Sequence, residues 1–274
     1  MSAVLISGAG RGIGLACTRR LAAAGTTVYA GVRSASHRDL LGEIDGVHPL
    51  LLDVTEPDSI AALGDVLPDR LDAVVNNAGI ALQGPVETVP PNDFTDQLDV
   101  NVTGPLRLTQ AVLPRIRASR GRIVMISSLS GLLATPGTGA YCASKFAIEA
   151  LTDALRIELR PWKIHVSLIQ PGTTRTDMWT NVVEEFDAVS DAMSAEHREL
   201  YEPQLTRMRG LLPRMQKLAV DPDKVAKSVE HALTSSRPRR RYRCDAASRA
   251  QVLATSCAPA AVTDMILSAA TRRG

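Results

Sequence analysis

Two side chains suited to proton transfer, Tyr141 and Lys145, stand four residues apart near the middle of the chain. The run from Tyr141 to Arg160 has helical periodicity, and residues at i and i+4 lie on one face of a helix. A free tyrosine, with a pKa of about 10, is a weak acid or base at neutral pH. A nearby cation favours the phenolate, so we expect Lys145 to lower the pKa of Tyr141 toward the working range.

A third group, the hydroxyl of Ser128, comes thirteen positions before Tyr141, where a predicted strand from Arg122 to Ser127 ends in a glycine-bearing loop. Its hydroxyl can bind a substrate oxygen that the phenol also touches. A tyrosine and a lysine at this spacing are by themselves more often a solvated helix face. Proton transfer becomes the preferred interpretation because the rest of the chain supplies a nucleotide site.

That nucleotide site begins at the segment Ser7-Gly8-Ala9-Gly10-Arg11-Gly12-Ile13-Gly14, which separates a predicted strand (Val4 to Ser7) from a helical pattern that stops at Gly25. Glycines let backbone approach a pyrophosphate, and a helix N-terminus supplies N–H groups and positive potential. The glycines at 8, 12 and 14 give GxxxGxG rather than GxGxxG. The segment predicts a phosphate-binding loop; the alternative is a turn-rich connection without a ligand.

The end of the second predicted strand (Thr26 to Val32) indicates which dinucleotide is used. A site that prefers NAD carries a carboxylate here for the ribose 2′-hydroxyl, and Val32 cannot accept a hydrogen bond. Arg33 and Ser34 follow, and Arg11 stands in the glycine loop. Two guanidiniums and a hydroxyl suit a 2′-phosphate, which predicts NADP(H). The alternative is that both arginines are ordinary solvated charges.

Three later strand ends carry polar groups. Asp53-Val54-Thr55 offers an acceptor for an adenine amine, although Asp53 is equally suited to cap the following helix. Asn76-Asn77-Ala78-Gly79 suits a turn whose backbone faces a ligand. Gln170-Pro171-Gly172-Thr173-Thr174-Arg175-Thr176 places hydroxyls and amides near the expected nicotinamide. The strands that precede them are expected at Val47 to Leu52, Leu71 to Val75 and Lys163 to Ile169.

A long helical pattern from Pro91 to Arg117 is interrupted at Asn101-Val102-Thr103-Gly104-Pro105. Asn and Gly-Pro within helical periodicity predict a kink. An unpaired asparagine amide at this kink would hold a water against Lys145. The alternative is a bent helix without a chemical role.

Repeated strand–helix units with apolar strands predict one α/β domain spanning residues 1–274, a Rossmann-like doubly wound parallel sheet of about seven strands flanked by helices. Ligands of such sheets bind beyond the carboxyl ends of the strands, where every motif above lies. Residues 178–218, rich in Met and Leu, are expected to form a helical substrate lid; the alternative is a plain helical subdomain. Arg237–Arg243 is expected to be a solvated basic surface with an edge strand at Arg241 to Cys244.

Composition limits the class of protein. The chain has 274 residues, a net charge of +2, 45% hydrophobic and 22% charged residues, which favours neither nucleic acid nor a membrane surface. Its N-terminus enters a strand directly, without a visible export signal. The cysteines, at positions 17, 142, 244 and 257, lack metal-binding spacing and are expected to be reduced thiols. We therefore expect a cytoplasmic protein without a metal site.

Taken in order, these motifs resemble the short-chain dehydrogenase/reductase family. The resemblance covers about the first 180 residues, with Ser7 in place of the usual threonine. The segments that carry it are Ser7–Gly14, Asp53-Val54, Asn76–Gly79, Asn101, Ser128, Tyr141–Lys145 and Pro171-Gly172 with Thr176.

The resemblance implies hydride transfer between a nicotinamide and a carbonyl or alcohol. It implies Tyr141 as the acid or base, Lys145 on the nicotinamide ribose, Ser128 on the substrate oxygen, and Asn101 holding a relay water. It also implies a bulky lipophilic substrate (retinoid-, steroid- or ketide-like) and a homodimer or homotetramer. The alternatives are a dehydrogenase that uses NAD, an epimerase or dehydratase, and a non-catalytic dinucleotide sensor.

Overall fold

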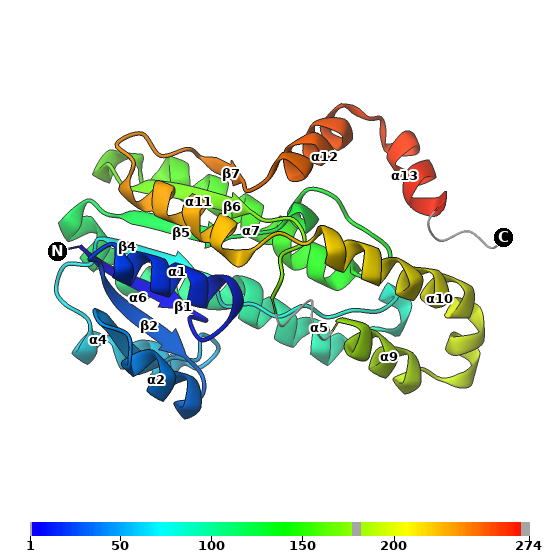
Figure 1. Cartoon of the computed structure of the whole chain (residues 1–274), viewed down its shortest axis with the longest axis horizontal. Helices are drawn as coiled ribbons and strands as arrows, with labels where there is room; N and C mark the ends of the chain where they lie inside the picture. Colours follow the sequence, from blue (N-terminus) through cyan, green and yellow to red (C-terminus); the bar gives the residue numbers. More distant parts are fainter. Residues whose placement is uncertain (1, 177–181, 270–274) are drawn as a thin grey trace.

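The computed structural model describes residues 2–176 and 182–269. Its middle layer is a seven-stranded sheet in the order β3-β2-β1-β4-β5-β6-β7, with every strand pair parallel (Figure 1). The strands are β1 (Ala3–Ser7), β2 (Thr27–Val32), β3 (Val47–Leu51), β4 (Ala73–Asn76), β5 (Arg122–Ile126), β6 (His165–Gln170) and β7 (Arg241–Arg243). The order reverses between β1 and β4, so the predicted Rossmann-like sheet is confirmed.

Helices cover both faces of this sheet. One face carries α1 (Gly12–Ala23), α2 (Ala35–Gly42) and α11 (Pro222–Thr234). The other face carries α3 (Pro57–Ala61), α4 (Leu63–Val66), α6 (Gly104–Ser119) and α7 (Gly139–Glu158). Figure 1 shows α5 (Pro91–Leu98), α9 (Val182–Ala192) and α10 (Ala195–Leu218) at the end of the molecule toward which the strands point, and α12 (Ala246–Cys257) and α13 (Ala260–Ala269) after β7.

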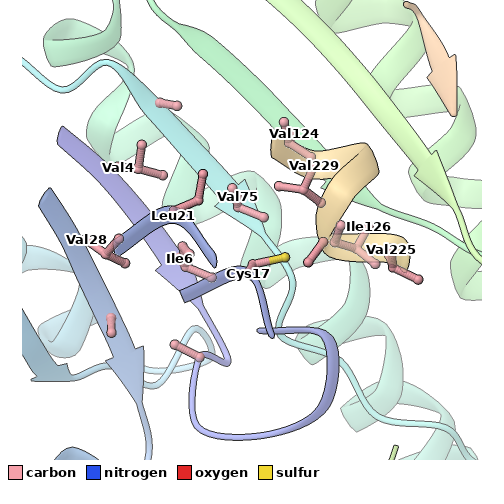
Figure 2. Close-up of a cluster of buried hydrophobic side chains, with 14 of the residues drawn as sticks. Val4, Ile6, Cys17, Leu21, Val28, Val75, Val124, Ile126, Val225 and Val229 are labelled. Carbon is pink, nitrogen blue, oxygen red and sulfur yellow. The ribbon is translucent and has the colours of Figure 1, made fainter. Parts of the chain in front are cut away.

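Side chains alternate between the two faces along each strand. Val4 and Ile6 of β1 point into the cluster with α1 and α11, whereas Leu5 points into the cluster with α6 and α7. Figure 2 shows the first cluster, in which Cys17 of α1 and Val225 of α11 meet residues of the strands. Because both faces are buried, successive strand residues are apolar, as in parallel sheets generally.

The predicted kink in the long helix is a π-helical turn, η2 (Asp99–Thr103), between α5 and α6. Pro105 lies in the first turn of α6, where proline fits without loss of a helical hydrogen bond. A side chain at Gly104 would collide with Val54, since an added Cβ would lie 2.6 Å from its Cγ2. The turn therefore packs closely on the loop after β3 and brings Asn101 into the interior.

Residues 182–218 form the helical pair α9 and α10, and residues 178–181 of the expected lid lie outside the described part. The two ends of this insertion are joined: Val220 donates its N–H to Thr173 O and accepts from the N–H of Arg175, both at 2.9 Å. Phe186, Met193, Leu205 and Leu212 form a separate apolar cluster between the two helices. The insertion is thus a helical hairpin that leaves and rejoins the sheet at one point.

No helix in residues 2–176 and 182–269 is long and apolar enough to cross a membrane.

Truncation of a buried side chain on α6 tests the packing described above. Leu108 is fully buried against the sheet, so Leu108→Ala should lower the free energy of unfolding by about 2–5 kcal/mol. Urea unfolding measures this loss. Leu40→Ala, at a leucine that is 63% exposed, is the control and should change stability by less than about 0.5 kcal/mol; equal effects of the two variants would contradict the packing.

Candidate active site

The loops after β1 and β4 are tied together where the strand order reverses. Ser7 Oγ accepts hydrogen bonds from the N–H groups of Asn77 and Ala78, both at 3.1 Å. The Asn77 amide donates to the carbonyl oxygens of Ser7 (3.1 Å) and Gly8 (3.0 Å). The serine at position 7 keeps a hydroxyl for this contact, and the Asn76–Gly79 turn holds the glycine loop in place.

The glycine loop is closely packed at Gly8 and Gly14, where a side chain would not fit. A Cβ at Gly14 would collide with Gly8 O, and one at Gly8 (φ +65°) would lie 2.9 Å from Ala78 Cα. No side chain caps the first turn of α1, which starts after Arg11. The N–H groups of Gly12, Ile13 and Gly14 at this helix end are therefore available to an anion.

Basic groups lie at the outer side of the glycine loop. Arg33 is exposed at the end of β2, and Arg11 is exposed within the loop. Ser34 caps α2 by accepting the His37 N–H at 3.2 Å, and its hydroxyl lies 2.9 Å from His37 Nδ1. The His37 ring packs on Gly10, where an added Cβ would lie 2.8 Å from Cγ.

His37 was missed by the sequence reasoning. The position of His37, three residues after the helix-capping Ser34, is the sequence pattern that predicts this contact.

Asp53 closes a local turn. Its Oδ1 accepts from the N–H (3.0 Å) and the hydroxyl (2.7 Å) of Thr55. Burial acts to raise its pKa, but the hydrogen bonds from Thr55 and the charge of Arg33 outweigh burial and lower the pKa of Asp53. The alternative that Asp53 caps α3 is wrong, because the residue at that cap is Glu56 and no side chain bonds there.

Ser128, Tyr141 and Lys145 meet at the carboxyl end of β5. Tyr141 and Lys145 lie on one face of α7, with Lys145 Nζ 5.6 Å from the centre of the tyrosine ring. The Ser128 side chain hydrogen-bonds the phenol, and its oxygen also accepts from the Ser130 N–H at 3.1 Å. Lys145 is 6% exposed and donates to Ile126 O at 3.1 Å.

The protonation of the pair differs from the expectation. Burial raises the pKa of Tyr141 to about 12, and the hydrogen bond with Ser128 opposes this rise. Burial also lowers the pKa of Lys145 to about 8, and the charge of Glu149 opposes that fall. The prediction that Lys145 brings the pKa of Tyr141 toward neutral is wrong for this structure, because burial is the largest effect on the pKa of each group.

Asn101 is 1% exposed in η2, and its amide is fully used. Nδ2 donates to Ile80 O (2.8 Å) and Ser144 Oγ (3.0 Å), and Oδ1 accepts the Ile80 N–H (2.8 Å). The expectation of an unpaired amide at the kink is therefore wrong. A Cβ at Gly79 would lie 3.3 Å from Asn101 Oδ1 and 3.8 Å from Lys145 Nζ, so these three residues form one wall of the site.

The segment after β6 joins the two halves of the site. Pro171 O accepts the N–H of Leu129 at 3.0 Å, beside Ser128, and Thr174 Oγ1 donates to Gly172 O at 2.9 Å. Thr176 contacts the glycine loop, since a Cβ at Gly12 would lie 3.0 Å from its methyl group. The structure thus brings all the sequence-predicted site residues to one edge of the sheet.

Within residues 2–176 and 182–269, no three His, Cys, Asp or Glu side chains are placed to hold a metal ion. Cys17, Cys142 and Cys244 are free thiols; the side chain of Cys257 lies outside the described part.

Fold and site together define a dinucleotide-binding α/β protein with a serine, a tyrosine and a lysine at the strand ends. The family model described as short chain dehydrogenase matches residues 2–187. The chain belongs to the short-chain dehydrogenase/reductase family.

Curated relatives align along nearly the whole chain. Retinol dehydrogenase 5 of Mus musculus is 33% identical over 282 residues, which cover 96% of this chain and 87% of the mouse protein. The uncharacterized oxidoreductase YbbO of Escherichia coli is 35% identical over 269 residues, which cover 96% of this chain and 93% of that protein. The protein is accordingly an oxidoreductase of this family.

Solved structures share the fold. A short chain dehydrogenase from Burkholderia cenocepacia, in complex with NADP, has a TM-score of 0.76 and 22% identity, and the match covers 97% of each chain. A short chain dehydrogenase/reductase from Burkholderia phymatum, in complex with NAD, has a TM-score of 0.77 and 23% identity over 92% of each chain. The first of these structures holds NADP and the second holds NAD, so the fold alone does not select between the two cofactors.

A methyl group at Gly14 tests the glycine loop. Gly14→Ala places a Cβ against the carbonyl oxygen of Gly8, which displaces the loop from the end of α1. The dissociation constant for NADPH, measured by fluorescence titration, should rise about tenfold or more. Gly64→Ala is the control, because an added Cβ there meets nothing within 4 Å. Unchanged affinity in a folded Gly14→Ala protein would contradict this account of the loop.

Proposed function

We propose that this protein is an NADP(H)-dependent oxidoreductase that transfers a hydride between the nicotinamide and a carbonyl or alcohol of a bulky lipophilic molecule. The observation that carries the proposal is the meeting of half-buried Ser128, half-buried Tyr141 and buried Lys145 beside the glycine loop. The phenol and the serine hydroxyl converge, so that one substrate oxygen can contact both.

The residues present fit a dinucleotide. The tightly packed backbone at Gly8 and Gly14 and the uncapped start of α1 form a cradle for a pyrophosphate. Arg11, Arg33 and Ser34 would hold the 2′-phosphate, and Asp53 and Val54 would hold the adenine. Asn77–Gly79 and Lys145 would hold the nicotinamide ribose. The nicotinamide amide would be held by Pro171, Gly172, Thr174 and Thr176. The bound cofactor supplies or accepts the hydride.

The chain's own residues move and place the proton. Ser128 donates to the substrate oxygen and orients it. Because the pKa of Tyr141 lies well above 7, the phenol is protonated at neutral pH and donates its proton as the carbonyl is reduced. In the oxidative direction the same oxygen takes the proton from the alcohol, which higher pH favours. Asn101 holds the backbone at Ile80 and Gly79 against the lysine.

The preference for NADP(H) rests on this chain's own residues. Buried Val32 stands where a carboxylate would select NAD, and Arg33 follows it in an exposed position. Asp53 offsets part of the charge of Arg33. A dehydrogenase that uses NAD, or an epimerase or dehydratase with a tightly held NAD, is the alternative if NADH binds better.

We propose that α9 and α10 form a substrate lid over the Tyr141 end of the site. The Met208 side chain rests on Gly137, where an added Cβ would collide with it, and Val189 lies against Gly84. Tyr201 Oη donates to Glu87 at 2.7 Å. Gly137 lies just before α7, so the lid contacts the loop that leads to Tyr141. The apolar cluster between α9 and α10 and the similarity to a protein named retinol dehydrogenase support a lipophilic substrate.

An assembly of identical chains is also proposed. On α7, Phe146 is 45% exposed and Ile157 is 62% exposed, and apolar side chains on this surface support a homodimer or homotetramer. The cytoplasmic location and the single domain of residues 1–274 stay predictions.

Removal of one oxygen tests the reaction. Tyr141→Phe should lower turnover by about 10²–10⁴-fold while NADPH still binds within about twofold. Turnover is followed by NADPH absorbance across ketones, aldehydes and secondary alcohols. Tyr29→Phe, at a tyrosine on β2 that stacks on His48, is the control. Retained activity in Tyr141→Phe would refute its role, and no turnover of any compound by the wild type would favour the dinucleotide sensor.

Removal of one charge tests the cofactor. Arg33→Ala should raise the dissociation constant for NADPH about tenfold or more while that for NADH changes by less than about twofold, because only NADPH carries the 2′-phosphate. Arg38→Ala removes an arginine of α2 that is already paired with Asp39 and should alter neither constant. A wild-type protein that binds NADH more tightly would overturn the NADP(H) proposal.

A further inference from the structure

A buried carboxylate, Glu149, lies one helical turn after Lys145 on α7 and is 7% exposed. Its Oε1 accepts from Ser127 Oγ at 2.8 Å and from Gln170 Nε2 at 3.0 Å. Its Oε2 accepts from Gln170 Nε2 at 3.1 Å and from Arg241 Nε at 3.3 Å. Donors from β6, from β7 and from the residue that follows β5 therefore meet at one carboxylate.

Two of these donors, Ser127 and Gln170, border the proposed active site. Ser127 directly precedes Ser128, and Gln170 directly precedes Pro171. Gly131 packs against the same group, because an added Cβ there would lie 3.0 Å from Glu149 Cγ and 3.0 Å from Lys145 O. Glu149 thus fixes the ends of β5 and β6 against the helix that carries Tyr141 and Lys145.

Arg241 supplies the positive charge behind Glu149. Its guanidinium also binds Asp153 Oδ2 at 2.6 Å, and Asp153 pairs in addition with Arg156. Arg241 belongs to the basic run Arg237–Arg243, where we expected a solvated surface. For this arginine the expectation is wrong, because β7 places it over the carboxylates of α7.

Among the described residues, several uncharged groups contact Lys145 or lie beside it. They are the phenol of Tyr141 on the same helix, the carbonyl of Ile126 from β5, the amide of Asn101 from η2 and the backbone of Gly79. Glu149 supplies the negative charge that faces Lys145 from one turn away, while Arg241 and Asp153 stand behind it.

We propose that Glu149 is a positioning residue that keeps Lys145 cationic and holds the ends of β5 and β6 in place; its catalytic consequence rests on the proposed function. Burial acts to deprotonate Lys145, whose pKa lies near 8, and Glu149 acts in the opposite direction. Without this carboxylate, the ammonium would lose its proton at lower pH, within the range where the enzyme works.

The test follows the charge of Lys145 directly, in the full chain without added cofactor. The sequence has five lysines, at positions 145, 163, 217, 224 and 227, so ¹³C labelling at lysine Cε gives few resonances. The resonance of Lys145 is assigned by its loss in Lys145→Arg. In Glu149→Gln its titration midpoint should fall by about one pH unit.

Asp153→Asn is the matched control. Asp153 lies one turn further along α7 and shares Arg241, but it is 42% exposed at the side chain and pairs with Arg241 and Arg156 rather than with Ser127 or Gln170. This variant should leave the Lys145 midpoint within about 0.2 units of the wild type. An unchanged midpoint in Glu149→Gln, or an equal shift in Asp153→Asn, would overturn the proposal.

A second variant keeps the proposal testable if Glu149→Gln does not fold. Arg241→Gln removes the opposing cation and leaves the carboxylate, so the Lys145 midpoint should rise. A midpoint that stays or falls would overturn the proposal.

A kinetic measurement then connects the charge to the reaction. The alkaline limb of the kcat profile should move to lower pH in Glu149→Gln, with turnover at pH 8 reduced roughly fivefold, and it should not move in Asp153→Asn. If the Lys145 midpoint shifts in Glu149→Gln but the wild type turns over no substrate, the positioning role of Glu149 is supported. The proposed function is then contradicted.

Discussion

The constraint on which this structure depends is the burial of a lysine ammonium at the end of a parallel sheet. An ammonium that leaves water loses hydration worth several kcal/mol, which neighbouring groups must replace. Here the carbonyl of Ile126 and the charge of Glu149 do so. Tyr141, Lys145, Glu149 and Asp153 recur every fourth residue along one face of α7, so a single helix face carries the phenol, the cation and the carboxylates. The rest of the site is assembled against that face.

Close backbone contacts at glycines bring the neighbouring loops to this face of α7. Gly79 admits Asn101 and Lys145 at its side, Gly104 lets the π-helical turn approach Val54, and Gly131 leaves space for Glu149. π-helical turns are rare and often lie at functional sites, and this one turns the amide of Asn101 inward. The base of the site is formed where strands end, whereas α9 and α10 reach the loops before α7 through side chains such as Met208.

The relatives and the site residues indicate the same family, while solved structures with this fold hold different cofactors. Structural neighbours with NADP and with NAD share the fold. The helical hairpin that precedes Val220 contacts the body of the protein through Val220, through Tyr201 at Glu87 and through Met208 at Gly137.

The sequence by itself determined the Rossmann-like sheet, the family and the segments of the site, because apolar strands, glycine turns and i, i+4 spacing are local patterns that each leave a signal within a few residues. Strand and helix ends were predicted to within about two residues for this reason. Only the tertiary structure decided how the groups are paired. The contact of His37 with Gly10, the full use of the Asn101 amide and the pairing of Arg241 with Glu149, 92 positions apart, join segments that no local pattern connects. The pKa values of Tyr141 and Lys145 likewise follow from burial, which depends on the packing of the whole chain rather than on the four residues that separate them.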